Sequence, residues 1–279
     1  MLMLAHLQGQ ARPMLIRHGY DITIECPQPT PLICLLVIRD ERRVDLKEQG
    51  LVESFPPVPI RTYNDLFGNT CLRMTAPQGT FRLRHESVVR DTGLDDPQYP
   101  GAREMAIPDL PDYTLNYLLG SRYCETDELS QMAWDLFGHM QPGWGRVQAI
   151  CNYAHNRIRF DYSQARATRT AADANREGVG VCRDYAHLAI ALCRCMNIPA
   201  RYVNGYLGDM GVPVTGPMDF AAWIEVFLDG QWMTFDPRNN IPRIGRIKVA
   251  QGRDAADVPL MHSFGQHMLT KFTVICDVV

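Results

Sequence analysis

The chain has 279 residues, of which 46% are hydrophobic and 21% charged, and its formal net charge is −3. This composition is typical of one large or two modest globular domains, and the small charge argues against nucleic acid as a partner. The longest apolar run, residues 32–38, is far shorter than the roughly 20 residues that cross a bilayer, so we expect no membrane partner. The nine cysteines follow no disulfide-framework spacing, which predicts mostly reduced thiols and a cytoplasmic protein.

Residues 14–90 have the pattern of an all-β module. Tyr20, Ile22 and Ile24 alternate with polar residues, which predicts a strand with one buried face. Short strands then recur with turn signals about every ten residues, which suggests a β-sandwich or a barrel-like module. Residues 91–112 follow with several acidic side chains and four prolines, a composition typical of a linker.

The pattern changes in residues 113–279, where helices are expected first and antiparallel strands afterwards. Apolar residues recur at helical spacing in three stretches, and alternation of period two follows in three more. The expected helices are 113–119, 127–140 and 146–158, and the expected strands are 201–207, 222–228 and 231–235. Asp229 and Gly230 give a hairpin signal between the last two strands. This order predicts an α+β core.

Residues 178–200 hold the central candidate of this core. A glycine-containing loop ends just before Cys182, and the apolar run that follows predicts a buried helix stopped by Pro199. A cysteine in the first turn of a helix faces unpaired backbone N–H groups and the positive end of the helix dipole. Both favour the thiolate, so we expect a lowered pKa and a nucleophilic Cys182 at neutral pH.

Three blocks of the chain resemble bacterial transglutaminase-like cysteine proteins. They are GVCRDYAHLAIALCRCMNIPARYVNGYL at 180–207, DFAAWIEVFLDGQWMTFDPRNN at 219–240 and the helix RVQAICNYAHNRIRFDY at 146–162. A fourth block at 241–259 resembles the tail of the same family, and residues 14–90 resemble the β-rich region that often precedes the family domain. The resemblance implies an α+β fold with a papain-like transglutaminase core behind an all-β N-terminal module.

The resemblance also implies a triad, in which a cysteine attacks, a histidine takes its proton and an aspartate orients the imidazole. Cys182 fits the nucleophile, and Asp236, at the end of WMTFDP, fits the orienting residue. The family's histidine lies in a strand of the form D-x-H-A-W, and Ala221 occupies that slot here. The general base is therefore missing, although general acid–base help of this kind is worth roughly 10²- to 10⁴-fold in rate.

Three explanations for Ala221 stay open at this level: a histidine replaced deliberately to trap a complex, a lineage that naturally lacks it, or another group that takes its place. His187 does not rescue the site, because it projects about 140° round the helix from Cys182. His262 and His267 lie in the tail and would reach the site only if the chain folds back.

Aromatic residues in these blocks are candidates for binding the substrate. Trp223, Tyr162 and Tyr206 are placed where they could line a cleft beside the nucleophile. Cys193 and Cys195 do not suggest a metal site, because C-x-C in a helix directs the two thiols about 200° apart. We therefore expect no metal and no cofactor.

The combined expectation is a cysteine amidase, peptidase or acyl transferase that acts on amide bonds through a Cys182 thioester. The alternative is a catalytically inactive or altered member of the same family that binds a peptide or protein partner in the same cleft. In both cases the expected partner is a peptide or a protein. The identity of residue 221 discriminates between the two, and the sequence does not fix the oligomeric state.

Overall fold

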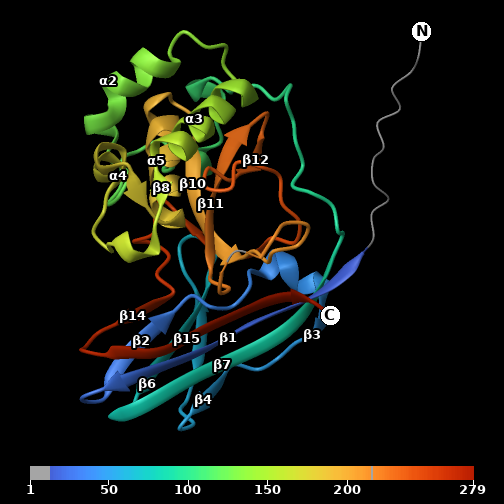
Figure 1. Ribbon diagram of the computed structural model, residues 1–279, viewed down its shortest axis with the longest axis vertical. Helices are drawn as coiled ribbons and strands as arrows, with labels where there is room; N and C mark the ends of the chain where they lie inside the picture. Colours follow the sequence, from blue (N-terminus) through green and yellow to red (C-terminus); the bar gives the residue numbers. More distant parts are fainter. Residues whose placement is uncertain (1–12, 215) are drawn as a thin grey trace.

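Two antiparallel sheets form the β part of the molecule, which lies below the helices in the computed structural model (Figure 1). The structure describes residues 13–214 and 216–279. One sheet has the strand order β15-β1-β7-β3, with β4 also paired to β7, and the other has the order β14-β2-β6-β5. Their bounds are β1 Met14–Cys26, β2 Thr30–Cys34, β3 Leu46–Glu48, β4 Glu53–Phe55, β5 Arg61–Asn64, β6 Thr70–Ala76, β7 Gly79–Asp91, β14 Met261–Ser263 and β15 Met268–Val278, and a 3-10 turn spans Asp40–Asp45.

Alternation along β1 explains why this part of the chain forms a layered sheet. Every second residue from Ile16 to Cys26 is buried, and the strand pairs with β7 along its whole length. Leu32 of β2 and Met74 of β6 belong to the same apolar core as these residues. Strands of period two with one apolar face bury that face most easily against another sheet, which is the arrangement observed.

The last two strands require a correction to the predicted core of residues 113–279. β14 pairs with β2, and β15 pairs with β1 from Ile16 opposite Val278 to Glu25 opposite Met268. The chain therefore returns to the β part after completing the core, and β15 becomes an edge strand of the larger sheet. Local alternation shows that these residues form strands, but it does not show which distant strand they join.

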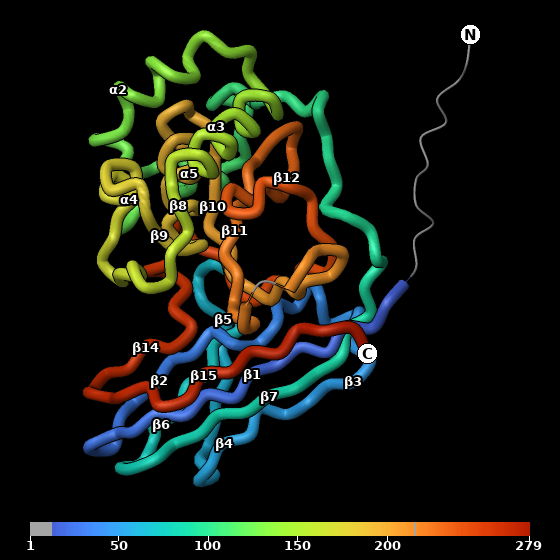
Figure 2. Tube along the Cα trace, in the orientation of Figure 1, coloured from blue at the N-terminus to red at the C-terminus, as the bar shows by residue number. Residues whose placement is uncertain are grey.

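The acidic segment 91–112 packs against the core as an ordered strap (Figure 2). The backbone N–H of Asp96 donates to the carbonyl oxygen of Arg243 at 2.8 Å. In return, the backbone N–H of Arg243 donates to the carboxylate of Asp96 at 2.9 Å. Further along, Glu104 accepts a hydrogen bond from the backbone of Gly143 and pairs with Arg146, and both side chains are largely buried. The strap includes a 3-10 turn at Ile107–Asp109 and leads into the first helix.

The remaining elements form the core, in which helices pack on a four-stranded antiparallel sheet of order β12-β11-β10-β13. The helices are α1 Asp112–Leu115, α2 Thr126–Phe137, α3 Trp144–Arg157, α4 Ala171–Glu177 and α5 Cys182–Cys195; the sheet strands are β10 Ala200–Tyr206, β11 Ala221–Leu228, β12 Gln231–Phe235 and β13 Ile247–Gly252. A short parallel pair, β8 Arg159–Phe160 and β9 Val179–Gly180, and a 3-10 turn at Tyr162–Gln164 complete it. The predicted α+β class is confirmed. No helix among the described residues is long and apolar enough to cross a bilayer.

Helix α5 is the centre of the core because it is buried on all sides. Every residue from Asp184 to Cys195 is buried, and α5 contacts α2, α3 and α4 as well as β10 and β11. A helix buried in this way is stable only when other elements surround it and its few polar side chains, such as Asp184 and Arg194, have partners. The end of the helix follows from Asn197, which has a φ of 63°, and from the proline two residues later.

Gly205 allows the strands on either side of β10 to approach closely. It lies opposite Ala221 of β11, and an added Cβ would sit 2.2 Å from the carbonyl oxygen of Ile247 and 2.8 Å from the ring of Trp223. A backbone atom on one side and a buried indole on the other leave no direction for relaxation. The strand geometry beside residue 221 therefore requires glycine at this position.

We expect Gly205→Ala to destabilise the protein by roughly 1–3 kcal/mol, the usual cost of overpacking a core. Chemical denaturation of the whole chain measures the change. Gly101→Ala is the matched control, because an added Cβ there meets nothing within 4 Å. Equal stability of the two variants would show that β10 can shift, and would contradict the close packing described above.

Candidate thiol site

The first turn of α5 is fixed by a buried carboxylate. The carboxylate of Asp184 accepts a hydrogen bond of 2.8 Å from the backbone N–H of Val181, which is the residue before the helix. Arg169 forms an ion pair with the same carboxylate at 3.2 Å, and both side chains are buried. Gly180 makes room, because an added Cβ there would lie 2.6 Å from Asp184. Asp184 thus has the helix-capping role and holds the neighbouring Cys182 in place.

Cys182 lies on the wall of a cavity of about 490 Å³ between the core and the β part. The core contributes Asp219 and Ala221 to this cavity, and the β part contributes Ile22 of β1 and Phe272 of β15. Because β15 returns from the end of the chain, the cavity is closed by residues that are almost ninety positions away from the nucleophile in sequence. The lining is mainly apolar, and its charged residues include Arg183 and Asp219.

Burial raises the pKa of Cys182 to about 11. Arg238 lowers it through its positive charge, Asp219 raises it further, and the backbone N–H groups of Ala222 and Arg183 lower it. The expectation of a lowered pKa is therefore wrong. The donors at a helix start do favour the thiolate, but the cost of moving its charge out of water outweighs them when no imidazolium stands beside it.

Ala221 and Asp236 stand at neighbouring ends of β11 and β12, as the family pattern implies. Ala221 is buried and lines the Cys182 cavity. Asp236 directly follows β12 and accepts hydrogen bonds from both the backbone and the side chain of Asn239, at 2.9 and 2.7 Å. Where an imidazole would be oriented, Asp236 instead pairs with Arg246 at 2.7 Å. Burial alone would raise the pKa of Asp236, but Arg246 and Asn239 hold it below the usual value.

Arg246 connects three segments of the chain in one buried cluster. Its Nε donates to both carboxylate oxygens of Asp96 in the strap, at 2.9 and 2.8 Å, while its Nη2 donates to Asp236. Its guanidinium carbon lies 5.0 Å from the centre of the Trp223 ring. Trp223 is only 2% exposed and is absent from the cavity wall, so the prediction that it lines the cleft is corrected. Its ring packs against Arg246 inside the core instead.

The other two aromatic candidates have different surroundings. Tyr206 is fully buried and packs against His18 and Phe220, so it does not reach the cavity; the prediction that it lines the cleft is corrected for the same reason as that of Trp223. Tyr162 is 50% exposed, and its hydroxyl donates to Asp219 at 3.3 Å.

Tyr162 lines a second cavity of about 560 Å³, on the other side of residue 221. Arg238, Asp219 and Ala221 border it as well, so Asp219 and Ala221 belong to both cavities. Arg238 and Asp219 are charged residues that the sequence did not single out. Their positions in the sequence could have revealed them, because Arg238 lies two residues after Asp236 and Asp219 lies two residues before Ala221.

Three histidines were considered above as possible bases, and of these His262 lies on β14 opposite Ile33 of β2 and does not line the Cys182 cavity. His187 is fully buried, and its Nε2 accepts a hydrogen bond from the backbone of Ala255, so it belongs to the core. His267 lies on the wall of the Cys182 cavity, where the tail does fold back, and its Nδ1 is 2.8 Å from the hydroxyl of Ser263. No group of three or more potential metal ligands occurs among the described residues.

A helix-borne cysteine facing a strand pair that ends in an aspartate defines a papain-like thiol fold. The model of the transglutaminase-like superfamily matches residues 131–237. An uncharacterized protein of Mycobacterium tuberculosis is 35% identical over 73% of this chain and 71% of its own length, and one of Mycobacterium leprae is 26% identical over 81% and 84%. The crystal structure of a "Putative Cysteine Protease" from Cytophaga hutchinsonii has a TM-score of 0.83 and 28% identity, covering 96% of this chain and 92% of that one.

The chain belongs to the transglutaminase-like superfamily. The match to the Cytophaga structure extends over both the β part and the core, so the β-rich N-terminal region is part of the shared architecture.

We expect Arg246→Met to destabilise the protein by roughly 3–5 kcal/mol, because it leaves the buried carboxylates of Asp96 and Asp236 without a cation. The control is Arg253→Met, because this arginine is itself exposed and its pair with Asp257 should be worth less than about 1 kcal/mol. The pKa of Asp236 is depressed in the folded protein, so the stabilisation exists above the unfolded pKa of about 4 and is lost as the pH falls. Denaturation curves at pH 7 and pH 3 that show the same difference between wild type and Arg246→Met would contradict this.

We expect alkylation of Cys182 to accelerate about tenfold per pH unit across the neutral range, since only the thiolate reacts. Arg238→Gln should move the midpoint of the profile upward and Asp219→Asn should move it downward, because the first removes a favourable charge and the second an unfavourable one. Peptide mapping after iodoacetamide treatment assigns the label among the nine cysteines. A midpoint at or below 8 in the wild-type protein would show that the thiolate is stabilised despite its burial.

Proposed function

We propose that the cavity at Cys182 receives an amide of a peptide or protein substrate, and that the Cys182 sulfur attacks it to form a thioester. The observation that carries the proposal is the exposure of the thiols. All nine cysteines are free, eight of them are buried, and the partly exposed one lies at the start of α5 on a cavity wall. Nine free thiols also support a reducing compartment such as the cytoplasm.

The reaction divides into two steps. The thiolate adds to the carbonyl carbon, the carbon–nitrogen bond breaks, and the amine leaves with a proton. Water then attacks the thioester to release an acid and the free thiol, or an amine attacks it to form a new amide. Backbone N–H groups at the start of α5 are the expected donors to the oxyanion. Hydrolysis and acyl transfer share the first step.

The substitution at Ala221 limits this chemistry in a specific way. With a methyl group at residue 221, no imidazole at that position supplies the proton for the departing amine, which then comes from water, from the substrate or from another group on the cavity wall, such as His267. The loss of general acid–base help corresponds to roughly 10²- to 10⁴-fold in rate. Turnover of an amide is therefore expected to be slow at neutral pH and to rise with pH as Cys182 ionises.

A second candidate is a cleft that binds a peptide without turning it over. The raised pKa of Cys182 and the engagement of Asp236 by Arg246 favour it. Both candidates use the same cavity, whose apolar lining suits the side chains of an extended peptide. They differ only in whether the thiol forms a covalent bond.

The test is turnover of a labelled peptide-amide library between pH 7 and pH 10, with Cys182→Ser as the blank. Ala221→His should raise turnover at pH 7 by at least about tenfold, since it restores a base beside the thiol. Ala221→Gln is the matched control, because its side chain is similar in size and does not titrate. Equal rates for these two variants would contradict the assignment of residue 221. Library peptides that bind but give no product with any variant at any pH would establish the binding cleft instead.

A further inference from the structure

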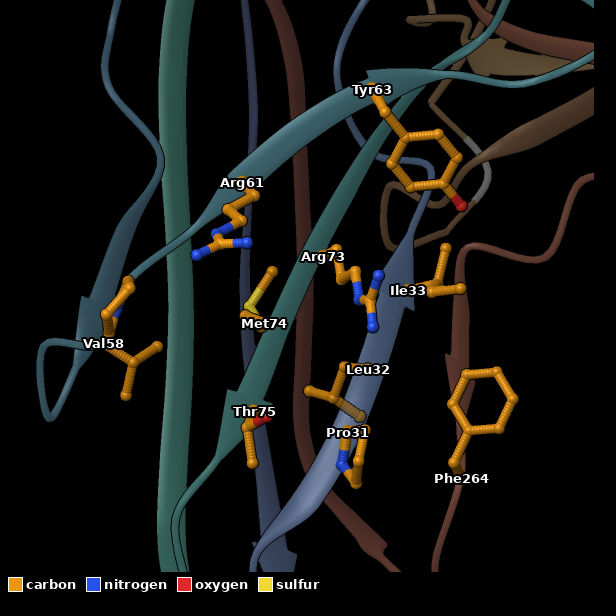
Figure 3. Close-up of a pocket in the computed structure, with 11 residues that line it drawn as sticks. Pro31, Leu32, Ile33, Val58, Arg61, Tyr63, Arg73, Met74, Thr75 and Phe264 are labelled. Atoms are coloured by element: carbon orange, nitrogen blue, oxygen red, sulfur yellow. The ribbon is translucent and has the colours of Figure 1, made fainter.

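The outward face of the sheet β14-β2-β6-β5 carries a pair of arginines that the thiol site does not use. Arg61 of β5 lies directly opposite Arg73 of β6, and Ile33 of β2 lies opposite Arg73 on its other side. Directly opposite residues of antiparallel strands share a face, so these side chains form one row. Figure 3 shows the side chains of Arg61 and Arg73 on these two neighbouring strands.

Neither guanidinium is neutralised within the described part of the chain. No carboxylate of the described residues lies within 4 Å of Arg61 or Arg73, although many of the other arginines have one, for example Arg82 with Asp21. Like charges placed directly opposite each other destabilise a strand pair. Each guanidinium also carries five N–H donors in a planar fork that matches a carboxylate. This arrangement costs stability in the free protein and would be relieved by an anionic ligand.

The two arginines border a groove of about 650 Å³ whose remaining lining is mainly apolar. Val58 closes one end, Phe264 lies at the other, and Tyr63 stands above Arg73 (Figure 3). None of the groove residues lines the cavity at Cys182. The groove is therefore a separate surface, and what binds there does not depend on the chemistry of the thiol.

We propose that this groove binds an acidic segment of a peptide or protein in extended conformation. In an extended chain, side chains two residues apart point the same way at a separation of about 6.6 Å, which suits two carboxylates reaching two neighbouring guanidinium groups. Apolar residues that flank the two carboxylates contact Val58 and Phe264 toward the two ends of the groove. The mainly apolar surroundings of the two arginines suit a peptide better than nucleic acid, whose binding depends on many cations along the phosphate backbone.

The proposal is tested by fluorescence anisotropy with the whole chain and a fluorescein-labelled peptide of alternating glutamate and leucine. The double variant Arg61→Gln/Arg73→Gln should weaken binding at least about tenfold, because two charge-assisted contacts are lost. The control is Arg90→Gln, an exposed arginine on β7 of the other sheet, and it should leave the affinity unchanged. Thermal unfolding of the double variant checks its fold, and no loss of stability is expected since a like-charge pair is removed.

Two further probes make the result specific. A peptide of alternating glutamine and leucine should bind at least about tenfold more weakly than its glutamate counterpart. A labelled single-stranded oligonucleotide should bind more weakly than the acidic peptide. Equal binding of the glutamate peptide to wild type and double variant, or equal binding of the two peptides, would overturn the proposal. Tighter, arginine-dependent binding of the oligonucleotide would overturn it in favour of a nucleic-acid surface.

Discussion

The ion cluster around Arg246 is the constraint on which the thiol site depends. Its guanidinium donates hydrogen bonds to Asp96 in the strap and to Asp236 at the end of β12. The same group lies over the ring of Trp223. Two buried carboxylates next to each other are tolerated only while a cation lies between them. The cluster therefore fixes the relative positions of the strap, the end of β12 and Trp223 of β11, the strand that begins at Ala221. It also engages the carboxylate that the family pattern reserves for an imidazole.

Two opposing effects set the pKa of Cys182: the N–H groups at the start of α5 lower it, and burial raises it. Helix α5 directs N–H groups toward Cys182, but the sulfur lies in an apolar cavity built from two parts of the molecule. Desolvation wins because its effect grows with burial, whereas a helix terminus contributes only a partial charge. In the family arrangement an imidazolium supplies the missing charge. Arg238 is the cation that acts on this thiol instead, and it lowers the pKa without being able to transfer a proton.

The local elements were predictable, because each is encoded by its own pattern. Alternation identified the strand around Tyr20, the mainly apolar run after Cys182 identified α5, and the short motifs named Cys182, Ala221 and Asp236 as candidate site residues. These signals depend on neighbours within a few residues. They carry most of the fold class, and they name Cys182, Ala221 and Asp236 as candidates whose roles stay a prediction.

The remaining features depend on contacts between distant residues. The pairing of β15 with β1 closes the cavity, yet no local pattern states which strand β15 joins. The burial of Trp223 and Tyr206 follows from their partners Arg246 and His18, and the raised pKa of Cys182 follows from the depth of a cavity with two walls.

The most direct test of the central claim uses an acyl donor that needs no proton to release its leaving group. A p-nitrophenyl ester of a peptide acid and the corresponding amide are incubated with the wild-type protein at pH 7 and pH 10, and intact mass and peptide mapping detect acylation. The account predicts that the ester acylates Cys182, faster at the higher pH, while the amide at pH 7 gives no acyl-enzyme. Acylation of Cys182 by both donors at equal rates at pH 7, or by neither at any pH, would contradict it.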